Sequence, residues 1–428
     1  MKILWVCNVT IPKIYEIRNQ ENRNCVGGWL EGMSDALLKS DDVTLIYCYP
    51  NYESNLLIEG HVSNFYSYGI PMTYKEASKT LNEKSPAVEY FKMIIEKEKP
   101  DVVHFWGTEF LYAQEFYNAI RIYDGYEKKV VVSIQGLVSV YAKHFDAGIP
   151  ERIMKSMTFS ELKGGCSLRS MKKSFVFRGE KEKALLKNVK NVIGRTSWDE
   201  ACTSIINPKR NYYKCNESLR NAFYNGQWNY KECKPHQIFI SQASYPIKGL
   251  HKVLEAASLI RKAYPDLLIK VAGQNIFHGN VIKGNTYGNY IQSLIRKYRL
   301  ENNIVFLGMI DAEKMKATLL ESNIFVCPSS IENSPNSLGE AMLLGVPCIA
   351  SDVGGCADMM EHKKEGFIYP FNESYKLAFY ICKIFEDDVL ASKIGKEAKK
   401  RALVTHDREK NNEALYKIYE NIMNKSLT

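Results

Sequence analysis

The sequence predicts an α/β protein with two domains, each made of a parallel β-sheet and crossover helices. Short runs of β-type residues alternate with helical patterns along the chain, as they do where helices connect parallel strands. This alternation stops at a polar and aromatic stretch near the middle of the chain and then starts again. The length of 428 residues also exceeds the roughly 250–300 residues that one hydrophobic core usually serves. Two domains are therefore expected.

Each half of the chain contains a set of short apolar runs that are typical of buried strands. Those in the first half are Lys2–Cys7, Val43–Cys48, Val102–Phe105, Val130–Ile134 and Asn191–Gly194. Those in the second half are Gln237–Gln242, Leu268–Ala272, Ile304–Leu307, Ile324–Cys327 and Pro347–Ala350. Helical spacing of apolar residues predicts helices between them, at Trp29–Leu38, Ala87–Glu98, Gly249–Ala263 and Tyr290–Tyr298.

The polar stretch Asn207–Gln237, which contains two prolines and a glycine, is the expected hinge between the domains. We predict a first domain over residues 1–206, a linker over 207–236 and a second domain over 237–407. Helical spacing in Arg408–Met423 predicts a last helix, within residues 408–428, that packs back against the first domain. Two Rossmann-like domains would face each other across a cleft, and ligands of such sheets lie beyond the carboxyl ends of the strands.

Composition excludes several classes of protein. The chain is 45% hydrophobic and 25% charged, which is ordinary for a soluble globular protein, and no apolar run approaches the roughly 20 residues of a membrane-spanning helix. Met1–Cys7 is better explained as a first strand than as a signal peptide. The 11 cysteines include no Cys-x-x-Cys pair, which favours reduced thiols over a disulfide framework or a zinc site. We therefore expect a cytoplasmic protein.

The net charge of +9 favours an anionic partner. Much of the basic excess lies between Arg152 and Arg195. This basic stretch is either a solvated helical face or a patch that binds an anionic membrane surface. Nucleic acid is not expected as a partner, because no recognition motif accompanies the basic residues.

The segment from Ile324 to Gly355 carries the main candidate site. A strand is expected to end at Pro328, and a helix is expected to begin near Asn336 after a polar loop. The amide groups of Asn336, Ser337 and Leu338 would then point out of the helix N-terminus and form an anion site suited to a phosphate.

Two carboxylates flank this predicted phosphate site. Glu340 would lie in the first turn of the helix, where it is either a helix-start acid or an acceptor of hydrogen bonds from a ribose diol. Glu332, eight residues earlier, could accept hydrogen bonds from the hydroxyls of a second sugar. A nucleotide sugar has hydroxyls at both ends and phosphate between them.

This run resembles the Glu-x7-Glu motif of retaining glycosyltransferases of the GT-B type, family 4 (glycosyl transferases group 1). The similarity covers most of the C-terminal half and includes Val271–Gly273, Asn303–Gly308 and Gly345–Gly355. The resemblance implies that Glu340 binds the donor ribose and Glu332 the hydroxyls of the donor sugar. It also implies donor contacts for a set of backbone groups, those of Gly273, Gly308, Met309, Ile310, Asn336, Ser337 and Leu338.

The resemblance makes Lys248, in the Lys-Gly pair before a helix, the cation that holds the donor diphosphate. The alternative is that Lys248 is an exposed lysine at a helix start. The family usually has an arginine five residues earlier, where this chain has Ala243. Arg195 is the candidate substitute, and the alternative is a structural ion pair between Arg195 and Asp199. Because the chain has no Asp-x-Asp motif, we expect no metal and no other cofactor. The dipole and backbone amides of the helix that begins near Asn336, together with Lys248, would then stabilise the leaving group.

In the first half of the chain, the segment Cys25–Trp29 contains Gly27 and Gly28 and opens a predicted helix. The segment resembles the family's Gly-Gly loop. Without the resemblance, a Gly-Gly pair is usually just a turn. Gln135 ends a strand where the family often has a histidine, and it cannot shuttle a proton. The candidate ligands of the acceptor are His104, Glu109 and His144, although a lone histidine is more often a packed or capping residue.

These residues lead to a hypothesis of function. The chain would be a metal-independent, retaining glycosyltransferase that moves a sugar from a nucleotide-diphosphate donor to a hydroxyl of a glycan or lipid-linked glycan. By resemblance it would serve surface polysaccharide synthesis, in the cytoplasm or peripherally on the inner membrane face. The alternative is a degenerate, non-catalytic nucleotide-sugar-binding protein of the same fold. A phosphorylase is disfavoured, because no lysine placed to hold a pyridoxal group can be singled out.

Overall fold

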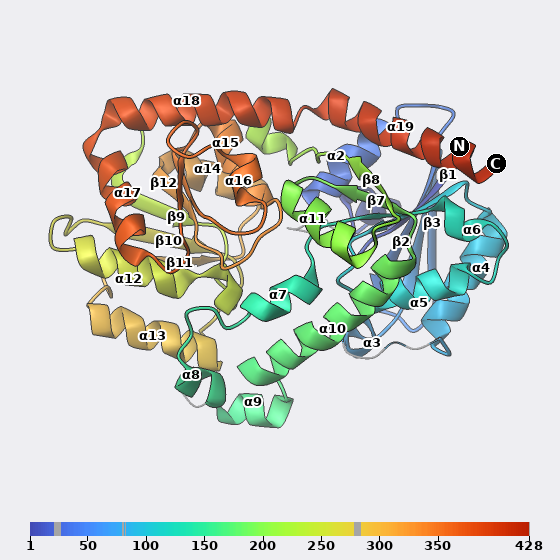
Figure 1. Cartoon of the computed structure of the whole chain (residues 1–428), viewed down its shortest axis with the longest axis horizontal. Coiled ribbons are helices and arrows are strands. Elements are labelled where there is room, and N and C mark those ends of the chain that lie inside the picture. The colour runs from blue at the N-terminus through green and yellow to red at the C-terminus, as the bar shows by residue number, and fades with distance from the viewer. Residues whose placement is uncertain (21–26, 79–80, 82, 278–283, 428) are drawn as a thin grey trace. The chain divides into compact units, whose positions relative to one another are not determined.

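The computed structural model of the protein describes residues 1–20, 27–78, 81, 83–277 and 284–427. They form two compact units (Figure 1). Unit 1 comprises Met1–Val140, Ser174–Ser218 and His406–Thr428, and unit 2 comprises Tyr141–Lys173 and Leu219–Thr405. Each unit has a sheet of mainly parallel strands connected by helices, so the predicted α/β fold class is confirmed.

Unit 1 contains an eight-stranded sheet in the order β3-β4-β2-β1-β5-β6-β7-β8. All neighbouring strands are parallel except β3, which runs antiparallel to β4. The strands are β1 (Lys2–Val6), β2 (Thr44–Asn51), β3 (Ile58–Val62), β4 (Phe65–Pro71), β5 (Val102–Trp106), β6 (Val130–Ser133), β7 (Asn191–Gly194) and β8 (Asn211–Lys214).

Both faces of this sheet are buried, because successive side chains of a strand point to opposite faces. Leu4 and Val6 of β1 belong to one apolar cluster, and Ile3 and Trp5 belong to the other. Helices cover both faces. They are α1 (Pro12–Ile17), α2 (Gly28–Leu37), α3 (Tyr74–Ser78), α4 (Pro86–Glu98), α5 (Leu111–Ile120), α6 (Tyr126–Lys129), α11 (Ser197–Ile206), α19 (Arg408–Leu427) and the later part of α10 (Leu168–Asn188).

Unit 2 contains a six-stranded parallel sheet in the order β11-β10-β9-β12-β13-β14. The strands are β9 (Lys234–Ile240), β10 (Leu268–Ala272), β11 (Ile304–Gly308), β12 (Ser322–Cys327), β13 (Cys348–Ser351) and β14 (Phe367–Tyr369). This order is that of the dinucleotide-binding α/β fold, in which the chain direction across the sheet reverses between the first and fourth strands. Here that switch point lies between β9 and β12.

The helices of unit 2 connect its strands and include the segment that enters from the first half of the chain. They are α8 (Glu151–Lys155), α9 (Phe159–Gly164), α12 (Leu250–Ile260), α13 (Thr286–Tyr298), α14 (Ala312–Glu321), α15 (Asn336–Leu344), α16 (Cys356–Met359), α17 (Ser374–Glu386), α18 (Asp388–Thr405), the 3-10 helices η1 (Asn221–Tyr224) and η2 (Pro246–Lys248), and the end of α7 (Val138–His144).

All ten strands expected from the sequence are present, with ends shifted by no more than a few residues. The division into units differs from the expected boundaries in one respect: Tyr141–Lys173 clusters with unit 2, although it lies inside the range 1–206. The chain passes from unit 1 to unit 2 between Ser218 and Leu219, which lie within the expected linker 207–236. However, β8 occupies part of that range as a strand of unit 1.

The last helix, α19, packs on unit 1, where the Trp5 indole donates to the hydroxyl of Tyr419 across 2.9 Å. The cysteines that the structure describes are all free thiols. Within the described ranges, none of the helices combines the length and the apolar character that crossing a bilayer requires.

Candidate active site

Two loops meet at the switch point of the unit 2 sheet. Strands β9 and β12 lie side by side and parallel, with Ile238 opposite Ile324. The loop after β9 carries Lys248, and the loop after β12 carries Glu332. Ligands of this fold bind in the crevice beyond the strand ends at such a switch point. The structure therefore brings together two residues that are 84 positions apart in the sequence.

Lys248 and Glu332 form an ion pair in which Nζ lies 2.6 Å from Oε1. The hydroxyl of Ser329 donates to the same carboxylate oxygen across 2.8 Å. The side chains of Lys248 and Glu332 are only 18% and 11% exposed. Burial opposes the charge of the Lys248 ammonium, but the charges of Glu332 and Tyr245 outweigh it and raise the pKa of Lys248. A permanent cation and a carboxylate thus lie at the strand ends.

Glycines allow these loops to approach each other closely. Gly249 has a φ of +70°, and a Cβ at this position would collide with the carbonyl oxygen of Pro328. The amide of Ser330 donates to the carbonyl of Ile247 across 2.7 Å, which joins the two loops beside Lys248. Lys248 is therefore held by the backbone of the loop that also carries Glu332.

Helix α15 begins at Asn336, as the sequence predicts, and its N-cap Pro335 supplies no side-chain cap. The Leu338 amide donates to the carbonyl of Pro335 across 2.9 Å, so the expectation of three outward-pointing amides is wrong for Leu338. The amides of Asn336 and Ser337 belong to the first two residues of α15. These two amides remain the candidates for a phosphate contact.

Glu340 is the fifth residue of α15, one position beyond the first turn in which we expected it. Its side chain is buried, and it binds a residue that the sequence did not reveal, Arg220. The Nε and Nη2 groups of Arg220 donate to the two carboxylate oxygens of Glu340, each across 2.7 Å. Burial raises the pKa of Glu340, and the hydrogen bonds and charge of Arg220 oppose that rise.

A cavity of about 430 Å³ lies at the ends of β10 and β11. Its lining includes Gly273, Gly308 and Ala243, together with the rings of Phe277 and Phe306, whose centroids are 4.6 Å apart. The volume is within the usual range for a small-molecule pocket. Of the expected donor contacts, Gly273 and Gly308 thus line this cavity, whereas Met309 is exposed and neither Met309 nor Ile310 lines it.

Residues from the first half of the chain also reach this site within unit 2. The hydroxyl of Ser330 donates to the carbonyl of His144 across 3.0 Å. Burial and the charge of Glu332 raise the pKa of Tyr141, which places this phenol near the Lys248–Glu332 pair. Of the expected acceptor ligands, His144 therefore lies beside the candidate donor site. No local motif singled out Tyr141, because only the chain's excursion into unit 2 brings it there.

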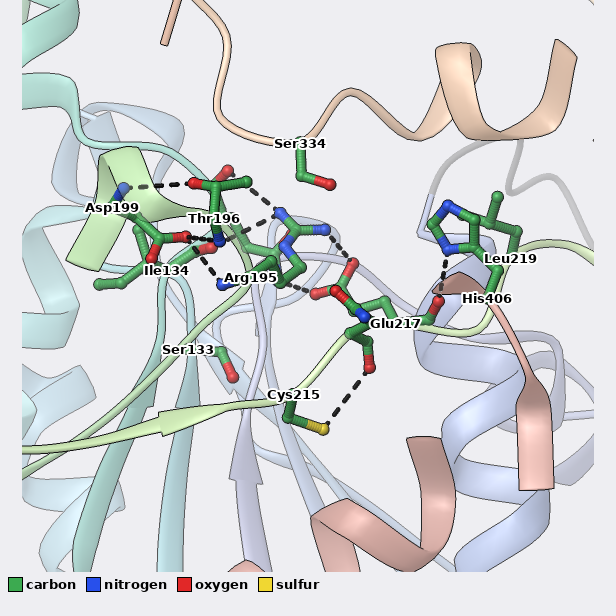
Figure 2. Close-up of polar contacts among 12 residues, drawn as sticks. Ser133, Ile134, Arg195, Thr196, Asp199, Cys215, Glu217, Leu219, Ser334 and His406 are labelled. Carbon is green, nitrogen blue, oxygen red and sulfur yellow. Dashed lines mark hydrogen bonds and ion pairs between the residues drawn. The ribbon is translucent and has the colours of Figure 1, made fainter. Parts of the chain in front are cut away.

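In unit 1, Arg195 binds Glu217 beyond the ends of β7 and β8 (Figure 2). The side-chain amide of Gln135, which follows β6, donates to the same carboxylate. The Arg195 guanidinium lies 2.7 Å from Glu217 Oε2, and both side chains are 5% exposed. The expected alternative partner, Asp199, instead accepts the backbone amide of Arg195 across 2.9 Å. Arg195 is thus in an ion pair, but with Glu217 and not with Asp199.

His104 lies within β5, and Glu109 lies in the loop that follows this strand in unit 1. His104 is fully buried, its ring nitrogens lie 2.7 Å from Tyr419 Oη and from Ser133 Oγ, and burial lowers its pKa to about 3. This position is that of a packed histidine and does not suit the expected acceptor contact. Burial raises the pKa of Glu109 to about 7, and its Oε2 has no hydrogen-bond partner in the described part of the chain.

The Gly-Gly loop opens a helix as expected. Gly27 has a φ of +80° at the N-cap of α2, and a Cβ there would lie 2.5 Å from the side chain of Val9. Gly28 is the first residue of the helix, while Cys25 and Val26 lie outside the described residues. Among the residues that the structure describes, no group of three or more His, Cys, Asp or Glu side chains is arranged to hold a metal ion.

Solved structures with this fold cover almost the whole chain. Sucrose-phosphate synthase from Thermosynechococcus elongatus matches with a TM-score of 0.73 and 17% identity, over 99% of this chain and 100% of that chain. HepE from Anabaena, solved in complex with UDP-glucose, matches with a TM-score of 0.64 and 15% identity, over 98% and 100% of the two chains. The protein therefore has the GT-B fold.

Residues 225–401 match the family model described as glycosyl transferases group 1. This match covers less than half of the chain and lies in the C-terminal half, where the sequence resembles this family. YtcC of Bacillus subtilis (strain 168), a glycosyltransferase by name, is 30% identical over 36% of this chain and 38% of its own length. WcaL of Salmonella typhimurium, named as a colanic acid biosynthesis glycosyltransferase, is 26% identical over the same two shares. The matches thus span less than half the length of these relatives.

Proposed function

We propose that the protein is a retaining glycosyltransferase of family 4 type that transfers a sugar from a nucleotide-diphosphate donor to a hydroxyl acceptor. The observation that carries this proposal is the Lys248–Glu332 ion pair at the β9–β12 switch point, beside the start of α15. It combines a cation, a carboxylate and a helix N-terminus where this fold binds ligands. HepE, which shares the fold, was solved with UDP-glucose, and this supports a nucleotide sugar as the donor.

In the proposed reaction, the bond between the anomeric carbon and the diphosphate oxygen breaks, and a bond to the acceptor oxygen forms on the same face. The leaving phosphate oxygen takes the acceptor's proton, so no protein base is required, and Gln135 need not titrate. The ammonium of Lys248 and the amides of Asn336 and Ser337 would stabilise the charge that develops on the diphosphate. These groups need no divalent ion.

The carboxylates would select and orient the donor. Glu332 would accept hydrogen bonds from the sugar hydroxyls, and Glu340 would accept them from the ribose. The 430 Å³ cavity next to Gly273 and Gly308 would hold the base. Arg195 is assigned no role on the diphosphate, because its guanidinium is already paired with the buried carboxylate of Glu217.

We further propose that the acceptor is a glycan or lipid-linked glycan of a surface polysaccharide, modified at the inner face of a membrane. WcaL, a relative over 36% of the chain, is named for colanic acid biosynthesis, and this supports a polysaccharide role. The basic stretch between Arg152 and Arg195 supports a negatively charged surface nearby.

The test is a panel of nucleoside diphosphates and their sugars, scored first by thermal shift and then by product formation. A cognate ligand at 100 times its Kd should stabilise the protein by about 2.7 kcal/mol. Proton NMR of the product should show the donor's anomeric configuration, and EDTA should leave the rate unchanged. Glu332→Gln should keep nucleoside diphosphate binding and lose transfer. Binding of a nucleotide sugar with no transfer to any acceptor and no donor hydrolysis would instead identify a non-catalytic binder.

A further inference from the structure

A short helix in unit 2 exposes its apolar side chains and buries the glutamate between them. We define the apolar tip as Met157, just before α9, and Phe159 and Leu162 within α9. Their exposed fractions are 48%, 66% and 64%. A surface helix normally turns such residues toward the protein core. The neighbouring helix α8 follows that rule, since its Met154 is buried.

Polar contacts fix α9 in this orientation. Thr158 and Glu161 form a capping box at its start, and both residues are buried. The Thr158 hydroxyl donates to the carbonyl of Gly284 across 2.7 Å, and Glu161 accepts the amide of Thr286 across 2.8 Å. Because Thr158 and Glu161 are three positions apart, they share the helix face that is anchored at the start of α13. Phe159 and Leu162, the residues that follow them, lie about 100° further round the helix and are exposed.

Exposed basic residues flank the apolar tip in the sequence. Within residues 150–173 the exposed charged residues are one acid, Glu151, and five bases, which are Arg152, Lys155, Lys163, Arg169 and Lys173. Only Lys155 of these pairs with Glu151. Exposed apolar side chains with basic neighbours in the sequence match the interface of a bilayer that contains anionic lipids. There, aromatic rings and aliphatic chains enter the acyl boundary and bases contact headgroups.

We propose that the apolar tip inserts into an anionic lipid bilayer and anchors unit 2 at the membrane surface. This deepens the proposed function, because it gives the enzyme a fixed approach to a lipid-linked acceptor. The charge disfavours a second copy of the chain as the occupant, since a symmetric contact would bring the basic segments of the two copies together. Three side chains are also few compared with the roughly 20–30 residues per side of a stable protein interface.

The test is flotation of the full-length protein with vesicles of phosphatidylcholine, with and without phosphatidylglycerol, at low and high salt. We expect binding to the anionic vesicles that weakens at high salt. The variant Phe159→Ser/Leu162→Ser should bind at least about tenfold more weakly, because two large apolar side chains no longer leave water. Each of Lys155→Gln and Lys163→Gln should weaken binding about fivefold.

Matched variants separate the tip from general surface effects. Val389→Ser/Val404→Ser removes two apolar side chains of α18 that are 73% and 70% exposed, and it should float like the wild type. Lys393→Gln/Lys396→Gln on the same helix should weaken binding by less than the tip lysines. Phe159→Trp should retain binding, and its added fluorescence should be quenched by brominated lipid.

Several outcomes would overturn the proposal. The first is that the wild-type protein does not float with anionic vesicles. The second is that the Phe159→Ser/Leu162→Ser variant floats as well as the wild type. The third is that sedimentation experiments show the tip driving self-association instead. Thermal shift with the donor nucleotide is measured on the same samples. A wild type that binds the nucleotide but not vesicles would therefore sink the membrane anchor and leave the proposed transferase activity standing.

Discussion

Arg220 holds both carboxylate oxygens of Glu340 in a bidentate contact, with 2.7 Å for each hydrogen bond. The two residues are 120 positions apart and belong to unit 2. A carboxylate has about four lone-pair positions, so a bidentate arginine leaves capacity for ribose hydroxyls. Arg220 can therefore orient Glu340 and offset its burial without occupying all of its acceptor sites.

Removing Arg220 should destabilise unit 2 in a pH-dependent way. Arg220→Met leaves a buried carboxylate without its partner, which typically costs about 3 kcal/mol or more. Burial already raises the pKa of Glu340, and the variant loses the group that lowers it. The folded form then favours the protonated acid, so the deficit should be small at acidic pH and grow as pH rises above the ordinary carboxyl range. Urea unfolding at pH 5 and pH 8 measures this difference.

The double variant Arg220→Met/Glu340→Gln provides the control for this prediction. It removes the titrating group, so its deficit relative to the wild type should depend little on pH. An equal deficit of Arg220→Met at both pH values would show that Glu340 does not carry the effect.

Lys248→Ala should lower the transfer rate by about 10²–10³, the usual effect of removing one preorganised electrostatic contact to a developing negative charge. The matched control is Lys252→Ala. Lys252 also pairs with a glutamate in the same unit, lying 3.1 Å from Glu255, and its side chain is 13% exposed. Steady-state kinetics with the cognate donor should give Lys252→Ala a kcat close to that of the wild type. Equal losses in the two variants would indicate that Lys248 matters for folding alone.

Gly249→Ala should destabilise the protein by more than backbone strain predicts. Gly125 has a similar φ of +75°, and no described heavy atom lies within 4 Å of the position that an alanine Cβ would take there. The Gly125→Ala variant therefore measures the cost of backbone strain alone, which is about 1 kcal/mol. Gly249→Ala adds the collision with Pro328 and should cost about 1–3 kcal/mol more. Denaturant unfolding compares the two, and equal costs would refute the close approach of the loops.

Glu109→Gln should make the protein more stable at pH 8 than the wild type, and should bring less benefit at pH 5. Burial raises the pKa of Glu109 to about 7, above its ordinary value. The folded state therefore loses stability as pH rises from the ordinary pKa of a glutamate to the raised pKa of Glu109, because the unfolded state releases its proton first. Since the amide has no proton to lose, the gain at pH 8 should be on the order of 1–3 kcal/mol.

Thermal unfolding of this variant across pH 5–8 tests the expectation. Glu180→Gln is the control, because the Glu180 side chain is 66% exposed and should show no comparable trend. A pH profile of Glu109→Gln parallel to that of the wild type would contradict the assignment.

Most of the strands that the sequence predicted are buried on both faces, and the edge strand β11, which is only half-buried, is an exception. Leu268–Ala272 and Asn191–Gly194 were placed to the residue, because a short apolar run between two helical patterns is typical of a buried parallel strand. The missed strands lie at or near sheet edges or are short. In β8, Asn211 and Lys214 are exposed and the tyrosines between them are half-buried, so its pattern resembles a polar linker. β14 has only three residues.

For the site, the sequence predicted the side chains but not their partners. Strand ends that meet at one edge of a parallel sheet place Lys248 near Glu332, and the resemblance pointed to both. Arg220 lies in a stretch interpreted as a hinge, and nothing local marks it as the partner of Glu340. Likewise, no spacing rule relates Arg195 to Glu217, since the contact depends on how the loops after β7 and β8 turn.

The chain passes between the two units four times, at Val140, Lys173, Ser218 and Thr405. Neither unit is therefore a continuous piece that a single cut could release. A hybrid enzyme made by joining the first half of one relative to the second half of another would separate Tyr141–Lys173 from the donor loops beside which it folds. It would also leave α19 without the strands that it covers. Grafting donor preference from one such protein to another thus requires exchanging two segments together, residues 141–173 and 219–405.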